Sequence, residues 1–282
     1  MSWMLVCVGR SQNVNVMRSS DLHSIVPDLT VPTMVAGEPK AGRRVKQQWS
    51  EYQGTGVYHV LYLPSNWKPD KKYPVIFEYA GNKYQSGPLD ISTGKVEGSQ
   101  LGYGLSAGSN FVWVCLPFVD KKAKANSDNW WGDIDATVEY CKISARRICD
   151  RFGGDSSRLV LCGFSRGAMA CGFIGLHDDE IASLWRAMIP YGVFDGPVYP
   201  GFDRASSIAR LSRFKGKPLL IVCEGNLRNK ETRAYLEGCS VPLSVTYLDL
   251  PFTNHNDAWA LRDIPERQTV RWWLGKALAL DR

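Results

Sequence analysis

The residues most informative about the fold are Leu159-Val160-Leu161-Cys162-Gly163-Phe164-Ser165-Arg166-Gly167. The first four residues are apolar and predict a short strand that is buried on both faces. The next five match the pattern G-x-S-x-G, and the mostly apolar residues 168–174 predict a helix. A serine between a buried strand and a helix lies in a tight turn that leaves its hydroxyl exposed at the helix N-terminus. We therefore predict that Ser165 is a nucleophile.

Strand and helix patterns alternate on both sides of this stretch. Strands are predicted at residues 57–63, 74–79, 111–119, 187–190, 218–223 and 243–250. Helices are predicted at residues 133–152, 181–186, 231–236 and 270–278. Such alternation predicts an α/β fold in three layers, with a mostly parallel central sheet and helices on both faces.

The organisation along the chain is expected to be simple. Residues 1–48 predict an irregular N-terminal lead-in, because Pro27, Pro32 and Pro39 interrupt any periodicity. Residues 49–282 are expected to form one catalytic domain without internal repeats. A stretch rich in glycine and serine, residues 80–110, separates two strands, and a loop of this length in a compact domain usually has a function.

A serine hydroxyl needs a neighbouring base that accepts its proton. The chain has four histidines, and only His255 lies in a loop just after the last predicted strand. The chain order serine, acid, histidine places the base there. Of the other three, His23 lies near the N-terminus, His59 lies in a strand pattern, and His177 lies at the end of the helix after Ser165. We predict that His255 is the base.

Two carboxylates between Ser165 and His255 compete for the role of the acid. Asp195 follows the strand 187–190, and Glu224 directly follows the strand 218–223. Asp195 is slightly favoured, because the glycines on either side of it permit the tight backbone that aims a short carboxylate. An aspartate would ordinarily be sought near position 226, where this chain has Asn226. Both alternatives therefore stay open.

Two backbone N–H groups are expected to bind the oxyanion that forms during acyl transfer. The first belongs to Arg166, directly after the nucleophile, and the second comes from the loop after the strand 74–79, at Gly81 or Asn82. The Arg166 side chain is expected either to bind a carboxylate of the substrate or to form a surface salt bridge.

Aromatic residues near the expected strand ends are candidates for the walls of the substrate site. They are Tyr84, Trp130, Trp131 and Trp259. Such side chains stack on sugar rings and on aromatic acids, although they also fill protein cores.

Composition excludes several classes of partner. The net charge is +6, but no basic module of a nucleic-acid-binding type is present, so no nucleic acid is expected. No run of about 18 apolar residues predicts a membrane span. The cysteines lack metal-ligand spacing, and neither a metal nor a cofactor is expected. The short apolar patch at residues 3–8 is a poor signal-peptide core, which leaves a cytoplasmic or a secreted location open.

Four segments together resemble a known group of enzymes. Tyr62-Leu63-Pro64, Pro74-Val75-Ile76-Phe77, Trp130-Trp131-Gly132-Asp133 and Gly163-Phe164-Ser165-Arg166-Gly167-Ala168 resemble the poly(hydroxyalkanoate)-depolymerase, feruloyl-esterase and acetyl-xylan-esterase group of α/β-hydrolases. The resemblance spans residues 50–280. It implies the α/β-hydrolase fold and a cofactor-free serine esterase that forms an acyl-enzyme at Ser165 with His255 as base. The implied substrates are carbohydrate-linked, aromatic or short-chain esters.

Two other functions compete with this prediction. One is a serine peptidase of the prolyl-oligopeptidase type, although no large extra domain that would gate a peptide is evident. The other is a catalytically silent, carbohydrate-binding protein on a hydrolase fold, which the asparagine at position 226 motivates.

Overall fold

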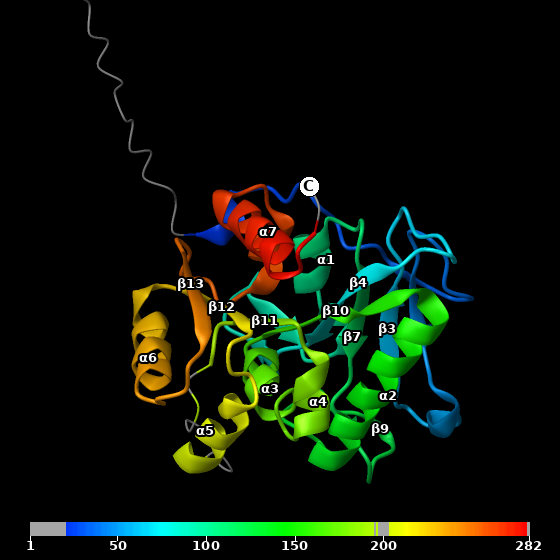
Figure 1. Ribbon diagram of the computed structural model, residues 1–282. Coiled ribbons are helices and arrows are strands. Elements are labelled where there is room, and N and C mark those ends of the chain that lie inside the picture. The colour runs from blue at the N-terminus through cyan, green and yellow to red at the C-terminus, as the bar shows by residue number, and fades with distance from the viewer. Residues whose placement is uncertain (1–20, 195, 197–202, 281–282) are drawn as a thin grey trace, which may run out of the picture.

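The computed structural model describes residues 21–194, 196 and 203–280, and its centre is a nine-stranded sheet (Figure 1). The strands, in their order across the sheet, are β1 (Met34–Val35), β2 (Arg44–Gln47), β3 (His59–Tyr62), β7 (Val112–Leu116), β4 (Tyr73–Tyr79), β10 (Gly154–Phe164), β11 (Ala187–Tyr191), β12 (Pro218–Glu224) and β13 (Ser244–Leu250). Only β3 runs antiparallel to its neighbours, β2 and β7, within this sheet. The prediction of a mostly parallel sheet is confirmed.

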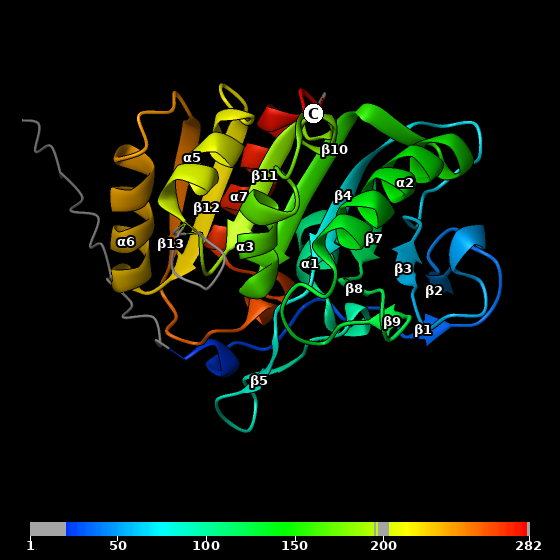
Figure 2. The same cartoon turned by 90° about the horizontal axis from the view of Figure 1, so that it is seen from below.

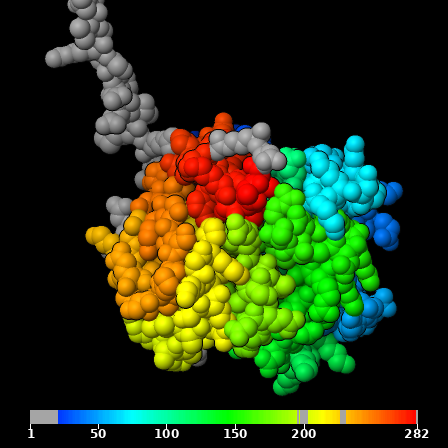
Figure 3. All heavy atoms as spheres, in the orientation of Figure 1, coloured from blue at the N-terminus to red at the C-terminus, as the bar shows by residue number. Residues whose placement is uncertain are grey.

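Helices cover both faces of the sheet (Figures 1 and 2). One face carries α2 (Ile134–Phe152), α3 (Arg166–Phe173), α4 (Asp179–Leu184), α5 (Arg204–Ser212) and α6 (Asn226–Glu237). The other carries α1 (Leu101–Ser106) and α7 (Pro265–Ala277). The space-filling view shows α7 at the surface, beside segments coloured orange and green (Figure 3). The three-layer arrangement is therefore confirmed.

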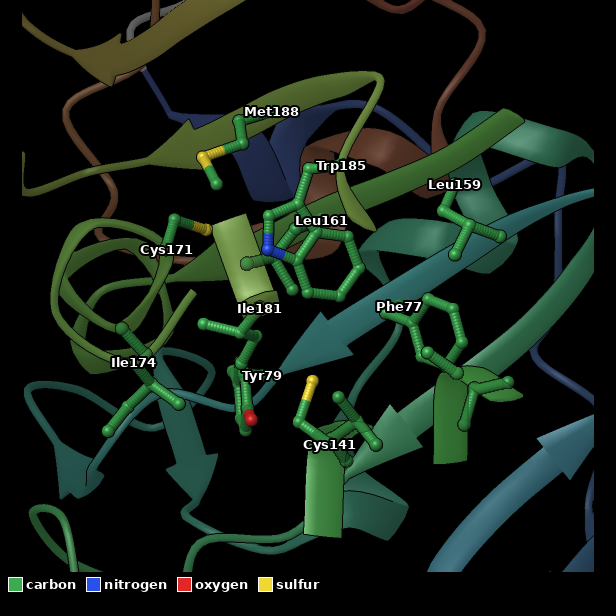
Figure 4. Close-up of a cluster of buried hydrophobic side chains, with 14 of the residues drawn as sticks. Phe77, Tyr79, Cys141, Leu159, Leu161, Cys171, Ile174, Ile181, Trp185 and Met188 are labelled. Carbon is green, nitrogen blue, oxygen red and sulfur yellow. The ribbon is translucent and has the colours of Figure 1, made fainter. Parts of the chain in front are cut away.

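Each face of the sheet has its own hydrophobic core, because successive side chains of a strand point to opposite faces. Phe77 and Tyr79 of β4 belong to the core on the α2 and α3 side, which Figure 4 shows with Cys171 and Trp185. Ile76 of the same strand belongs to the core under α1 and α7. Strands buried on both faces explain the nearly continuous apolar runs in the sequence.

The expectation of an irregular lead-in is wrong for residues 34–35 and 44–47, which form β1 and β2. Strand β2 pairs with β3 across the expected boundary between residues 48 and 49. It is a short strand with a single apolar residue, Val45, so it leaves no periodic signal in the sequence. Lead-in and domain thus share one sheet.

The glycine-rich stretch after β4 also contains regular structure. Its residues form the hairpin β5 (Lys83–Gln85) and β6 (Ile91–Thr93), a 3-10 helix η3 (Val96–Gly98) and helix α1. A second small hairpin joins β8 (Val119–Asp120) and β9 (Ala125–Asn126). The remaining 3-10 helices of the described residues are η1 (Leu22–Ser24), η2 (Ser50–Tyr52) and η4 (Asp257–Leu261). None of the helices in the described ranges is long and apolar enough to cross a membrane.

Candidate active site

Ser165 stands alone between a strand and a helix. Strand β10 ends at Phe164 and helix α3 begins at Arg166, so that only the serine forms the turn. Its backbone has φ 54° and ψ −113°, a region that non-glycine residues rarely adopt and that stores strain. Its N–H donates to the carbonyl of Tyr191 at 2.9 Å, which ties the turn to the end of β11.

Gly167 allows helix α3 to approach the sheet closely. A Cβ atom added at this position would lie 1.9 Å from the carbonyl oxygen of Tyr79, at the end of β4. A Cβ at Gly163 would meet the backbone of Gly167 at 2.3 Å. The first N–H groups of α3 have no carbonyl partner within the helix, and the helix dipole makes that end positive. Ser165 therefore lies at an end of α3 that favours a negative charge.

His255 and Glu224 are brought together by two neighbouring strands. Glu224 is the last residue of β12, and His255 lies in the loop that follows β13. The Nδ1 atom of His255 forms a hydrogen bond with the Oε1 atom of Glu224. The Glu224 side chain is buried, whereas that of His255 is 24% exposed. The structure thus pairs the predicted base with one of the two predicted acids; the other, Asp195, lies outside the described residues.

This pair lies beside the turn of Ser165. The imidazole of His255 packs on the ring of Phe164, with 4.6 Å between the ring centroids. A Cβ at Gly192 would lie 3.1 Å from Cε1 of His255 and 3.6 Å from Oε2 of Glu224. Gly192 follows the residue that accepts the N–H of Ser165. The serine, the histidine and the glutamate therefore converge at the carboxyl edge of β10, β11 and β12.

The Arg166 side chain is buried, which contradicts both expectations for it. Its guanidinium donates to carbonyl oxygens of three loops, namely Ala80 (3.4 Å), Gly81 (2.8 Å), Gly94 (3.0 Å), Ser127 (3.4 Å) and Trp130 (2.8 Å). It lies 4.0 Å from the centroid of the Phe118 ring, and burial lowers its pKa to about 9. The carbonyls neutralise this charge with dipoles rather than with a carboxylate. Arg166 thus fastens the surrounding loops and cannot receive a substrate carboxylate.

The loop after β4 lies against the serine turn. A Cβ at Gly81 would lie 3.0 Å from the ring of Phe164, the residue before Ser165. The side chain of Asn82 accepts the N–H of Trp130 at 2.7 Å. Asn82 and Arg166 therefore both bind the loop that carries Trp130 and Trp131.

Three of the four predicted wall residues lie near this edge. Trp130 is 43% exposed, and Trp131 is half-buried against Phe118 and Phe173. The hydroxyl of Tyr84 donates to the carbonyl of His255.

Trp259 does not line a surface site. Its side chain is fully buried and packs on Tyr191, with 5.7 Å between the ring centroids. It belongs to the core under α1 and α7, because η4 turns inward directly after the histidine loop. The expectation that Trp259 contacts substrate is therefore wrong.

Two buried carboxylates lie behind the histidine loop, and no sequence pattern indicates them. Glu78 accepts the backbone N–H of Gly102 and the indole N–H of Trp113, each at 2.7 Å. Asp257 accepts from Nε2 of Gln100 at 2.6 Å. Burial raises the pKa of both groups, that of Asp257 to about 7. In the described ranges no group of three or more histidine, cysteine, aspartate or glutamate side chains is placed to hold a metal ion.

The chain matches no protein-family model and no curated protein. Solved structures resemble it in fold. Fungal esterases from Rhizomucor miehei give a TM-score of 0.58 at 13% identity, covering 86% of both chains. A thermostable esterase gives 0.50 at 16% identity, covering 83% of this chain and 62% of its own. A putative dipeptidyl aminopeptidase IV from Bacteroides ovatus ATCC 8483 gives 0.58 at 12% identity, covering 83% of this chain and 35% of its own.

The chain thus spans less than two thirds of the thermostable esterase and about a third of the aminopeptidase. Likeness at such low identity concerns the fold. Together with the sheet order and the helices on both faces, it leads to one conclusion: this chain has the α/β-hydrolase fold.

Proposed function

We propose that the protein is a serine carboxylic-ester hydrolase that works through an acyl-enzyme at Ser165. The observation that carries this proposal is the contact of His255 Nδ1 with the buried carboxylate of Glu224, beside the strained turn of Ser165. A histidine oriented by a carboxylate next to a serine is the arrangement that activates a hydroxyl for acyl transfer.

Catalysis proceeds in two steps. In the first, the Ser165 oxygen attacks the ester carbonyl while Nε2 of His255 takes its proton, and the proton then passes to the departing alcohol. In the second, a water molecule attacks the acyl carbon and gives a proton to His255. The proton then returns to the Ser165 oxygen as the acid is released. Glu224 keeps the proton of the neutral imidazole on Nδ1 and stabilises the imidazolium that forms in each step.

Backbone donors stabilise the negative charge on the carbonyl oxygen. We assign the first to the N–H of Arg166, at the start of α3, and the second to the loop at Gly81 and Asn82. The Arg166 guanidinium supports this assignment, because its bond to the Gly81 carbonyl fixes the peptide that carries the Asn82 N–H. Arg166 thus has two roles. Its backbone N–H donates to the oxyanion, and its side chain orients the peptide that carries the second donor.

The aromatic residues at this edge support carbohydrate-linked, aromatic or short-chain esters as substrates. Trp130 presents an exposed ring beside the loop of Asn82. Tyr84 lies 5.5 Å from the imidazole, measured between ring centroids. A sugar ring or an aromatic acid gains stacking energy on such rings.

Hydrolysis of p-nitrophenyl acetate and butyrate tests the proposal. The wild type is expected to turn over both esters, and Ser165→Ala is expected to lose at least about a thousandfold in kcat while keeping the melting temperature. Ser212→Ala, at an exposed position in α5, is the matched control and should keep full activity. Equal activity of Ser165→Ala and the wild type would refute the role of Ser165.

A serine peptidase is the second candidate, and the likeness to the putative dipeptidyl aminopeptidase IV favours it. Aminoacyl p-nitroanilides, assayed beside the esters, separate the two activities. Turnover of anilides with slower turnover of esters would replace the esterase by the peptidase. Inertness toward both substrates and toward a fluorophosphonate probe would favour the silent carbohydrate-binding fold instead.

A further inference from the structure

The loop that carries His255 is held by a hairpin far away in the sequence. Asp90, at the tip of the hairpin β5–β6, accepts from Nδ2 of Asn254 at 3.0 Å and from Nδ2 of Asn256 at 3.2 Å. These two asparagines flank His255 on either side. A single carboxylate therefore holds both neighbours of the proposed catalytic base.

The same loop has further partners in this region. The hydroxyl of Tyr84, also on the hairpin, donates to the backbone carbonyl of His255, and that of Tyr191 donates to the carbonyl of Asn256 at 3.1 Å. Nδ2 of Asn256 also donates to the carbonyl of Leu89 at 3.2 Å. Every residue from 254 to 256 is thus fixed by a bond to another part of the chain.

The N-terminal segment completes this cluster. Nε2 of His23 lies 2.9 Å from the Asp90 oxygen that also accepts from Asn256, and the N–H of Leu22 donates to Oδ1 of Asn254 at 2.7 Å. Asn254 therefore receives a hydrogen bond on its oxygen and donates one from its nitrogen. Its amide has one orientation that satisfies both partners, because a flipped amide would place two donors face to face.

We propose that Asp90 is a positioning residue for His255, acting through Asn254 and Asn256. This inference rests on the proposed esterase function. Asp90 does not touch the reacting atoms; it sets the backbone from which the imidazole reaches both Glu224 and Ser165. A serine hydrolase needs this geometry within a fraction of an ångström, because small misplacements of a catalytic group are costly.

A reciprocal exchange of side chains tests the proposal. Asp90→Asn leaves one acceptor oxygen where the carboxylate has two, so the new amide N–H meets the Nδ2 donor of either Asn254 or Asn256. Asn254→Asp places two carboxylates at hydrogen-bond distance, so two acceptors meet. The double variant restores the bond between the two positions in reverse, because the new amide at position 90 donates to the new carboxylate at position 254. The bonds from Asn256 to position 90 and from the N–H of Leu22 to position 254 keep their direction. Both single variants should therefore be defective and the double variant active.

The expected effect of each single variant is a fall in kcat of about 10- to 100-fold on p-nitrophenyl acetate, with KM nearly unchanged. The double variant should recover most of the loss. Asp135→Asn is the matched control, since Asp135 also approaches a histidine, His177 at 3.7 Å, but on α2. Unfolded protein would also lower the apparent kcat at unchanged KM, so kcat is compared at a temperature at which circular dichroism shows all four proteins to be fully folded.

Proton NMR gives a readout that does not depend on turnover. The proton shared by His255 Nδ1 and Glu224 should give a far-downfield resonance in the wild type and in the double variant, and a weakened or shifted one in both single variants. Unchanged resonance and kcat in all four proteins would overturn the positioning role. A wild type that shows the resonance but hydrolyses no ester would overturn the proposed function, while the resonance of the variants would still decide the role of Asp90.

Discussion

Ser165 owes its exposure to a backbone conformation, not to its side chain. The φ of 54° is uncommon for any residue with a Cβ, and it persists because β10 and α3 fix both ends of the turn. The backbone bond to Tyr191 adds a third restraint. These restraints fix the backbone from which the hydroxyl projects, which is the pre-organisation that the proposed acyl transfer requires.

The acid is the residue for which the sequence left two alternatives. Local sequence slightly favours Asp195, because a glycine lies on either side of it. The sequence does not determine which of the two carboxylates faces the histidine, because this depends on how far β12 extends before the chain turns. The structure ends β12 at Glu224, so its longer side chain reaches Nδ1 of His255 directly from the strand.

Glu224→Gln should therefore lower kcat strongly, by up to about 10⁴-fold, because an amide favours the wrong imidazole tautomer. Asp195→Asn, the matched exchange at the alternative position, should leave kcat within a few-fold of the wild type. Steady-state kinetics on p-nitrophenyl butyrate decides between them. A severe defect in Asp195→Asn with an active Glu224→Gln would transfer the role of the acid to Asp195.

At the scale of elements, the close approach of α3 to β4 and β10 sets the site. The pattern G-x-S-x-G predicted this arrangement well, because each of its glycines lies where a side chain would clash with backbone. The buried role of Arg166 could not be predicted in the same way. Its acceptors are carbonyls of residues 80–81, 94, 127 and 130, and no sequence pattern shows that such distant backbone groups meet.

Two glycine-to-alanine exchanges in helices test the close approach. Gly167→Ala is expected to destabilise the protein by about 3 kcal/mol or more, because its methyl group would lie 1.9 Å from a backbone oxygen. Gly275→Ala in α7 has no atom within 4 Å of the added Cβ and should be neutral or stabilise by about 0.5–1 kcal/mol. Urea unfolding measures both. Similar free energies of unfolding for the two variants would contradict the packing described for α3.

At the scale of the whole molecule, the sheet brings residues distant in the chain to one edge. The alternating pattern sufficed to predict the three layers, because each buried strand and each helix with an apolar stripe leaves a local signal. The short strands β1 and β2, the hairpin β5–β6 and the clustering around Asp90 leave no such local signal. Their stability comes from pairing and polar contacts with segments that are remote in sequence.

The buried Asp257 links the stability of the molecule to pH. Burial raises its pKa from 3.8 to about 7, so between these values the folded protein holds a proton that the unfolded chain has lost. The contribution of this group to the free energy of unfolding therefore falls as the pH rises through that window. Asp257→Asn cannot titrate and still accepts from Gln100.

In urea unfolding series, the free energy of unfolding of the wild type should fall relative to that of Asp257→Asn between pH 4 and pH 7. These two pH values lie close to the unfolded and folded pKa of Asp257. The difference between the two proteins removes the contributions of the groups that do not interact with Asp257. Parallel pH profiles would show that Asp257 does not hold a proton in the folded state.

Covalent labelling with a fluorophosphonate probe identifies the nucleophile without a knowledge of the substrate. Intact-mass and peptide analysis should show one adduct per wild-type chain, located on Ser165, and none on Ser165→Ala. Labelling should slow markedly in Glu224→Gln, because the histidine then loses its orientation. An adduct on another residue, or an unmodified wild type, would contradict the account of Ser165 as the nucleophile.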